Sequence, residues 1–252
     1  MRLLEITSDG ALRLTKDLID NIPAYAILSH TWALNDEEEV TFEDLNARSG
    51  KNKPGYKKLV FCQRQAAHDG LRFFWVDTCC INKRSDPELS EAINSMFRWY
   101  KKAVHCYVYL SDVVGTSPRK ENTLEGTKGW ESAFRNSRWF TRGWTLQELI
   151  APRTVKFYNA DGELLGDKFS LVSIIRDITG IAEEALQGHS LSTFSVEDKL
   201  SWTAQRSTRR AEDAVYSLLG LFEISMPLVY GEGRENAYRR LRREIDESSK
   251  GS

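Results

Sequence analysis

Short hydrophobic runs alternate with segments of helical periodicity over the first 180 residues of the chain. The runs are uninterrupted, as in strands that are buried on both faces. Residues 56–70 and 88–103 instead place hydrophobic side chains three and four positions apart, which predicts amphipathic helices. The predicted strands lie at 25–29, 73–77, 106–110 and 155–158. Strands that alternate with helices predict an α/β fold in which a parallel sheet carries helices on its faces.

The pattern changes near residue 180, beyond which no further strand is predicted. A helix is expected to begin at Ser195, whose spacing to Asp198 is typical of a helix cap, and two more helices are expected at 211–221 and 232–245. We therefore expect a single domain, with an α/β core over 1–180 and a helical extension over 181–252 that packs on the core. Residues 113–129 are rich in Gly, Ser, Thr, Pro, Lys and Glu and predict a mobile surface loop.

Composition narrows the class of protein. The 252 residues are 41% hydrophobic, enough for a sizeable core, and 35 basic residues balance 36 acidic ones, so no partner nucleic acid is indicated. The N-terminus reaches an acidic residue at Glu5, which argues against a signal peptide, and no apolar run is long enough to span a membrane. Four cysteines without a CxxC motif favour a reducing compartment. We expect a cytoplasmic protein.

The segment 137–149 concentrates aromatic, basic and acidic side chains. Gly143 gives the backbone freedom just before a predicted helix, on which Trp144 and Glu148 lie one turn apart and share a face. An indole beside a carboxylate can exclude water from it and leave it reactive near neutral pH. The alternative is an ordinary amphipathic helix with Trp144 in the core and Glu148 in solvent.

Polar and aromatic residues follow the predicted strands where their carboxyl ends meet. Ser29, His30 and Trp32 follow the first strand, Asp77 ends the second, and Ser111–Asp112 follow the third. Ligands of doubly wound sheets bind at this edge. Indoles stack on rings, and hydroxyls and carboxylates bind ribose, so the edge suits a nucleotide-like ligand.

Other chemistries fit the sequence less well. Neither G-x-x-x-x-G-K-[ST] nor G-x-G-x-x-G is present. His30 with Cys79 or Cys80 would suit a thiol nucleophile, but these cysteines are better explained as buried small side chains, and their spacing to His105–Cys106 fits no standard zinc site. We therefore expect no metal. The charged residues near 210 are expected to form a network of ion pairs at a helix junction, and they are Arg206, Arg209, Arg210, Glu212 and Asp213.

Several blocks together resemble the fungal heterokaryon incompatibility (HET) domain over nearly the whole chain. The blocks are YAILSHTW at 25–32, WVDTCCI at 75–81, LSEAINSM at 89–96, GWTLQE at 143–148, AVYSLLG at 214–220 and MPLVYGEG at 226–233. The resemblance implies an effector of self/non-self recognition that triggers cell death. Such domains often form the N-terminal part of larger NLR-like receptors with a nucleotide-binding oligomerisation module, so the chain resembles an isolated effector domain or a fragment.

The order of elements also resembles, more distantly, TIR domains, which share a flavodoxin-like core. Enzymatic TIR domains cleave the nicotinamide–ribose bond of NAD+ with a glutamate in a Trp-bearing segment, and the matching residue here is Glu148. The resemblance implies a TIR-like NADase that needs no cofactor, takes NAD+ as substrate and works when oligomerised. The segment 113–129 and the helical extension depart from the TIR pattern.

The resulting prediction is a cell-death effector that hydrolyses NAD+ with Glu148 as its catalytic residue. The candidate substrate-binding residues are Ser29, His30, Trp32, Asp77 and Trp144. The expected partners are further copies of the chain and an NLR-type nucleotide-binding module, in the same protein or in trans. Two alternatives stay open. In one, a non-enzymatic signalling module uses Trp139, Phe140 and Trp144 in its core or for self-association; in the other, Glu148 is only a structural hydrogen-bond acceptor.

Overall fold

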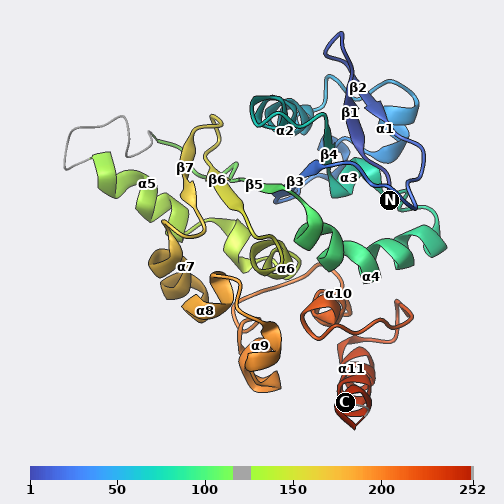
Figure 1. The fold of residues 1–252 in the computed structure, drawn as a ribbon, viewed down its shortest axis with the longest axis vertical. Helices are drawn as coiled ribbons and strands as arrows, with labels where there is room; N and C mark the ends of the chain where they lie inside the picture. The colour runs from blue at the N-terminus through green and yellow to red at the C-terminus, as the bar shows by residue number, and fades with distance from the viewer. Residues whose placement is uncertain (116–125, 251–252) are drawn as a thin grey trace.

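A single mixed sheet organises the computed structural model, which describes residues 1–115 and 126–250. Its seven strands run in the order β2-β1-β4-β3-β5-β6-β7. Figure 1 shows α2 on one face of the sheet and α4 and α6 on the opposite face, with the C-terminal helices beyond them. The strands are β1 Leu4–Ile6, β2 Leu12–Leu14, β3 Tyr25–His30, β4 Phe73–Trp75, β5 His105–Tyr109, β6 Val155–Tyr158 and β7 Leu164–Asp167.

The four central strands are parallel, as the hydrophobic runs predict. β3 pairs with β4 on one side and with β5 on the other, and β5 pairs with β6. All six residues of β3 are buried, because helices cover it on both faces. The chain moves from β3 to β4 in one direction and then back to β5 in the other. The gap between the carboxyl ends of β3 and β5 is therefore a topological switch point, where open α/β sheets bind ligands.

The prediction of an α/β fold with a parallel sheet and flanking helices is confirmed, and the sheet also has antiparallel strands at both edges that the sequence did not predict. β1 and β2 form a hairpin whose first strand pairs antiparallel with β4, and β7 pairs antiparallel with β6. These strands have only three or four residues, and β2 and β7 are incompletely buried. Runs this short carry too few alternating positions to be recognised in the sequence.

Two long helices cover the sheet close to their predicted positions. α2 spans Tyr56–His68, and α4 spans Asp86–Lys102 with a proline in its first turn. The shorter helices before the extension are η1 Asp36–Glu38, α1 Phe42–Asn46, α3 Asp77–Cys80, α5 Gly126–Arg135, η2 Arg138–Thr141, α6 Thr145–Ile150 and α7 Val172–Thr179. The loop predicted at 113–129 is shorter on its C-terminal side because α5 begins at Gly126, and residues 116–125 lie outside the described part of the chain.

The extension consists of short helices and one long one. They are α8 Glu183–Leu186, η3 Leu191–Thr193, α9 Val196–Ser201, α10 Asp213–Tyr216, η4 Leu219–Leu221 and α11 Arg234–Lys250. The predicted capping pair of Ser195 and Asp198 forms a complete capping box, whereas the helix predicted over 211–221 is divided into α10 and η4. At η4 the extension touches α4 directly, since a Cβ on Gly220 would lie 2.0 Å from the Cβ of Phe97.

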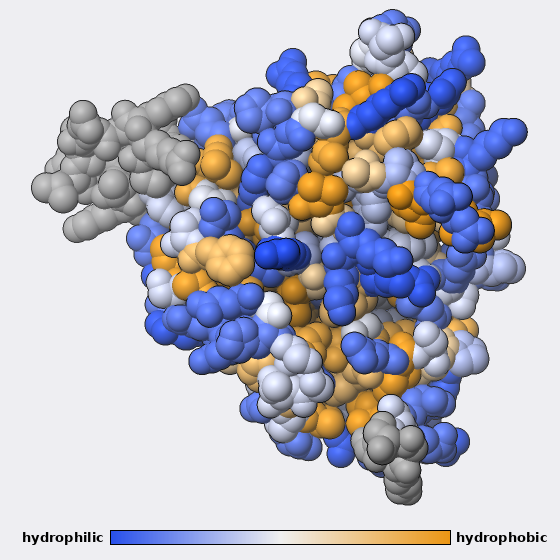
Figure 2. All heavy atoms as spheres, in the orientation of Figure 1, coloured by the Kyte–Doolittle hydropathy of each residue, from blue (hydrophilic) through white to orange (hydrophobic). Residues whose placement is uncertain are grey.

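The surface of this face is mostly hydrophilic, as Figure 2 shows. Hydrophobic residues gather in its lower part, where Figure 1 places α9, α10 and α11. Within the described residues, no helix is both long and apolar enough to cross a membrane.

Candidate functional site

A cavity of about 420 Å³ lies beside the carboxyl ends of β3 and β4, between α4, α6 and the start of α10. This volume is within the usual range of small-molecule sites. Its polar lining consists of His30, Trp32, Asp36, Asp77, Lys83, Tyr100, Arg142, Trp144, Thr145, Glu148, Arg209, Arg210, Asp213 and Tyr230. Its apolar lining is Ile81, Leu89, Ile93 and Met96. The cavity therefore joins residues of the core to residues of the extension.

Glu148 lies on α6, a helix whose six residues are all buried. Its carboxyl group accepts a hydrogen bond from the hydroxyl of Ser29, at the carboxyl end of β3. The Ser29 hydroxyl in turn accepts a hydrogen bond from the indole of Trp139 over 2.8 Å. Because the indole can only donate, it orients the Ser29 proton toward Glu148. Tyr100 also lies close to the carboxyl group of Glu148, and its hydroxyl donates to the Leu28 carbonyl.

Burial dominates the electrostatics of Glu148. The residue is only 7% exposed, and burial raises the pKa of its carboxyl group to about 8. The hydrogen bond from Ser29 lowers this pKa and the negative charge of Asp77 raises it further, but neither matches the effect of burial. At neutral pH the carboxyl group is therefore mostly protonated. The alternative in which Glu148 lies in solvent is excluded.

A second buried network fixes His30. The ammonium group of Lys58 lies 3.1 Å from His30 Nδ1 and also donates to the Thr31 carbonyl and to Glu39. An ammonium group can only donate, so Nδ1 accepts and the ring proton lies on Nε2, 3.1 Å from Asp77 Oδ1. The imidazole is therefore held in a single tautomer.

Asp77 collects donors from two directions. Besides His30, the indole of Trp32 donates to Asp77 Oδ2 over 2.8 Å, and Lys83 lies 3.7 Å from the same oxygen. Burial alone would raise the pKa of Asp77, but the positive charge of Lys83 and the hydrogen bond from His30 hold it well below its usual value. The Lys83 ammonium also lies 3.6 Å from the centre of the Trp32 ring, so it covers one face of that indole.

The extension supplies the opposite wall of the cavity. Asp213 accepts a hydrogen bond from Tyr230 over 3.0 Å. The guanidinium group of Arg210 lies 4.1 Å from the centre of the Tyr230 ring. Arg209 reaches across to Asp36 and forms an ion pair with its carboxylate. Residues from both ends of the chain therefore meet at the mouth of the cavity.

The two walls are joined next to Gly143. Its amide donates to the Ser207 carbonyl over 2.9 Å, and a Cβ at this position would lie 2.4 Å from Cγ2 of Thr208. Gly143 is not among the residues with positive φ, so close approach of the backbone, rather than the conformational freedom expected from the sequence, explains the glycine.

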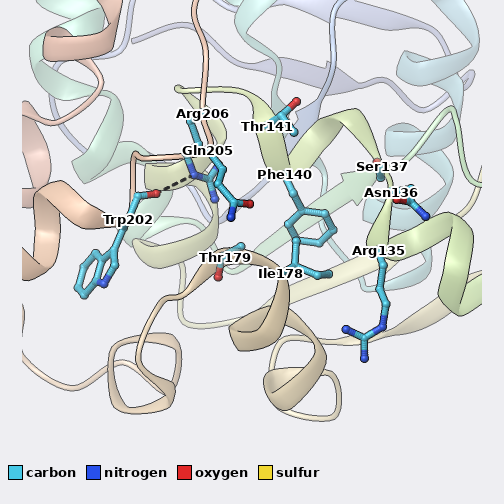
Figure 3. A pocket seen from close by; sticks show the side chains of 10 residues that line it. All are labelled: Arg135, Asn136, Ser137, Phe140, Thr141, Ile178, Thr179, Trp202, Gln205 and Arg206. Carbon is cyan, nitrogen blue, oxygen red and sulfur yellow. Dashed lines mark hydrogen bonds between the residues drawn. The ribbon is translucent and has the colours of Figure 1, made fainter.

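Arg206 reinforces the same contact from behind. It donates to the Arg142 carbonyl and to the Thr145 hydroxyl through Nη1, and to the Trp202 carbonyl through Nε. Figure 3 shows this last bond at the edge of a smaller cavity of about 170 Å³, where Arg206 and Gln205 lie beside Phe140. Nη2 of Arg206 is buried and has no hydrogen-bond partner among the described residues.

The structure brings the predicted site residues together. His30, Trp32, Asp77, Trp144 and Glu148 line one cavity, whereas Ser29 is fully buried behind Glu148 and does not face it. The third strand does not contribute as expected, because Asp112 instead accepts hydrogen bonds from Ser137 and the Arg138 amide. The charged and aromatic lining residues that the sequence did not assign to the site are Asp36, Lys83, Tyr100, Arg142, Arg209, Arg210, Asp213 and Tyr230.

Thiol chemistry has no support in this cavity. All four cysteines are buried and unpaired, and none lines it. Burial raises the pKa of Cys79 well above its usual value, which keeps that thiol protonated. Across the residues that the structure describes, no group of three or more His, Cys, Asp and Glu side chains is arranged to hold a metal ion.

The fold and the cavity define an α/β protein with a cavity of small-molecule size at the carboxyl ends of β3 and β4. Comparison with known proteins names the family. Residues 25–123 match the family model of the heterokaryon incompatibility protein (HET). The vegetative incompatibility protein HET-E-1 of Podospora anserina is 54% identical to this chain over 246 residues, which cover 97% of the chain and 18% of that protein. No solved structure matches the chain.

The chain belongs to the HET family. It spans less than a fifth of the length of the relative that it matches. The matched part of the family model includes His30, Trp32, Asp77 and Tyr100, but it ends before Glu148 and before the wall that the extension supplies.

Proposed function

We propose that this HET domain is a cell-death effector of fungal vegetative incompatibility that hydrolyses the nicotinamide–ribose bond of NAD+ when several copies cluster. The observation that carries the proposal is Glu148, a buried carboxyl group with a pKa raised to about 8, which faces a cavity of ligand size at the carboxyl ends of β3 and β4. The similarity to a vegetative incompatibility protein supports the biological role.

The chemistry uses Glu148 in its ionised form. As the bond between C1′ of the ribose and N1 of nicotinamide breaks, the electron pair moves to N1 and neutralises the pyridinium ring. The ribose becomes an oxocarbenium ion, which a carboxylate at this position stabilises. Water then attacks C1′ and gives its proton to Glu148. The products are ADP-ribose, nicotinamide and a proton, so the step balances.

The substrate itself favours the reactive state of Glu148. The nicotinamide ring of NAD+ is positively charged, and a positive charge beside a carboxyl group lowers its pKa. A carboxyl group that is mostly neutral in the empty cavity therefore ionises more readily when the substrate binds.

The wider context is part of the same proposal. We infer that the domain acts in the cytoplasm. We also infer that it acts within, or together with, a longer receptor that has a nucleotide-binding oligomerisation module, because the chain spans 18% of the related HET-E-1 protein. Such a module would bring several HET domains together and so control their activity.

The test is nicotinamide release from NAD+ by the purified protein, alone and fused to a domain that forces oligomerisation. We expect turnover by the wild type and a loss of about 10³-fold or more in Glu148→Gln. Glu184→Gln, which changes an exposed glutamate on α8, is the matched control and should retain activity. Absence of turnover in every assembled state would contradict the proposal.

The alternative is a non-enzymatic module that kills through recruited partners. Trp139 and Phe140 are 0% and 4% exposed, so they belong to the core and not to a self-association surface. Killing in cells by a folded Glu148→Gln variant would support this alternative. A variant that loses stability equally at all pH values would instead identify Glu148 as a structural hydrogen-bond acceptor.

A further inference from the structure

The lining of the main cavity carries opposite charges in equal number. Lys83, Arg142, Arg209 and Arg210 face Asp36, Asp77, Glu148 and Asp213. Because Glu148 is mostly protonated at neutral pH, the lining has one positive charge in excess. A partly buried charge without a partner is unfavourable, so the position of the excess charge indicates where an anion would bind.

Three of the four cations make a direct contact with a carboxylate or an aromatic ring. Lys83 lies 3.7 Å from Asp77, and Arg209 is paired with Asp36. Arg210 stacks on Tyr230, and its charge acts on Asp213, the hydrogen-bond partner of that tyrosine.

Arg142 is different. Its guanidinium group forms no hydrogen bond and no ion pair with any residue that the structure describes, although the residue is only partly exposed. Its carbonyl group is held by Arg206, so the backbone is fixed while the side chain is free to bind. Burial and the neighbouring charge of Arg209 lower the pKa of Arg142, and the negative charges of Glu148 and Asp213 only partly offset these two effects.

We propose that Arg142 is an anion-binding residue that takes the diphosphate group of a dinucleotide in this cavity. The planar guanidinium group offers parallel N–H donors that match phosphate oxygens. The inference rests on the proposed function for the identity of the dinucleotide, whereas the charge and the missing partner of Arg142 are independent of it.

The order of exposure along the cavity agrees with the order of groups in NAD+. Glu148 is 7% exposed, Arg142 is partly exposed, and the side chain of Arg209 at the mouth is 44% exposed. With the scissile ribose at Glu148, the diphosphate follows toward the mouth and reaches Arg142 and then Arg209. The adenosine end lies outermost, near the wall that the extension supplies.

The experiment measures binding without turnover, in the Glu148→Gln background. ADP and adenosine are titrated calorimetrically, because they differ only in the diphosphate. We expect ADP to bind more tightly than adenosine, and the added Arg142→Gln change to weaken ADP binding by about 10-fold to 100-fold without affecting adenosine. Arg142→Lys keeps the charge but not the paired donors, so its affinity for ADP should lie between that of the parent and that of Arg142→Gln. Arg138→Gln, a change in an arginine that pairs with Asp112 outside the cavity, should bind ADP like the parent.

The outcomes separate this inference from the proposed function. Equal affinity for ADP and adenosine, or an unchanged ADP affinity in a folded Arg142→Gln variant, would overturn the anion site even if NAD+ is cleaved. Arg142-dependent ADP binding in a protein that never cleaves NAD+ would leave the anion site in place and remove the enzyme. The side chain of Arg142 makes no bond to the described protein, so its variants should fold, and their thermal unfolding is measured beside binding.

Discussion

The two walls of the cavity are built in different ways. The core wall is held by buried bonds to the sheet, such as the chain from Trp139 through Ser29 to Glu148. The extension wall is held by half-buried and exposed contacts, such as the pair of Arg209 and Asp36. The core therefore fixes the chemistry of the site, whereas the extension sets its shape and much of its positive charge.

The contrast is sharpest at Glu148, whose burial should make the stability of the core depend on pH. The pKa of the Glu148 carboxyl group is about 8 in the folded protein, against 4.5 for a glutamate in the unfolded chain. Between these pH values the folded protein binds more protons than the unfolded chain, so the stability of the wild type falls as pH rises. Glu148→Gln cannot ionise and lacks this fall. We therefore expect the free energy of unfolding of Glu148→Gln, relative to that of the wild type, to increase by up to about 4 kcal/mol between about pH 5 and about pH 9.

Urea unfolding of both proteins at three pH values measures this difference. Glu184→Gln should track the wild type throughout. A constant difference between Glu148→Gln and the wild type at all pH values would show that the carboxyl group titrates normally.

The junction of the two walls should tolerate no side chain at residue 143. Gly143→Ala places a Cβ against Cγ2 of Thr208, and overpacking of this kind destabilises a protein by about 1–3 kcal/mol. Thr208→Ser removes that methyl group but keeps the hydroxyl that donates to the Arg210 carbonyl. We therefore expect the double variant to recover most of the stability and of the ligand affinity. If Thr208→Ser gives no recovery, the contact between the walls is not what requires the glycine.

Ser29 should act on the chemistry only through Glu148. Ser29→Ala removes a donor that lowers the pKa of the carboxyl group, so that pKa should rise further, by about one unit. The pH at which NAD+ cleavage reaches half its maximum should move upward with it, and the rate near neutral pH should fall about 10-fold. A lower rate with an unchanged pH profile would assign Ser29 a purely structural role.

The smallest effect is expected at the exposed end of the extension wall. Asp36→Asn breaks the pair with Arg209, whose two side chains are 62% and 44% exposed. Such a pair contributes roughly 0–1 kcal/mol, and less in high salt. Thermal unfolding in low and high salt measures it, and a larger effect that does not depend on salt would show that this pair is part of a buried network.

The sequence predicted the core wall better than the extension wall. Strand β3 and helices α2 and α4 have strong local patterns, and Glu148 stands one turn from Trp144 on a recognisable helix. The edge strands β1, β2 and β7 were missed because three or four residues carry little periodicity.

The cationic residues of the cavity were missed for a different reason. Arg209 meets Asp36 across 173 positions of the chain, and Arg206 meets Arg142 across 64. In the sequence, Arg206, Arg209 and Arg210 indicate only a network of ion pairs at a helix junction. No local pattern distinguishes an arginine that pairs with the protein from one, like Arg142, that has no partner in the described residues.

The most direct measurement is the pH dependence of kcat/KM for NAD+ cleavage by the clustered wild-type domain, which reports the ionisation of the free protein. If Glu148 must be ionised to act, kcat/KM should rise about tenfold per pH unit and level off near pH 8, and Glu148→Gln should be inactive throughout. A profile that is flat from about pH 5.5 to about pH 9, or cleavage by folded Glu148→Gln, would contradict the assignment of Glu148 as the catalytic carboxylate.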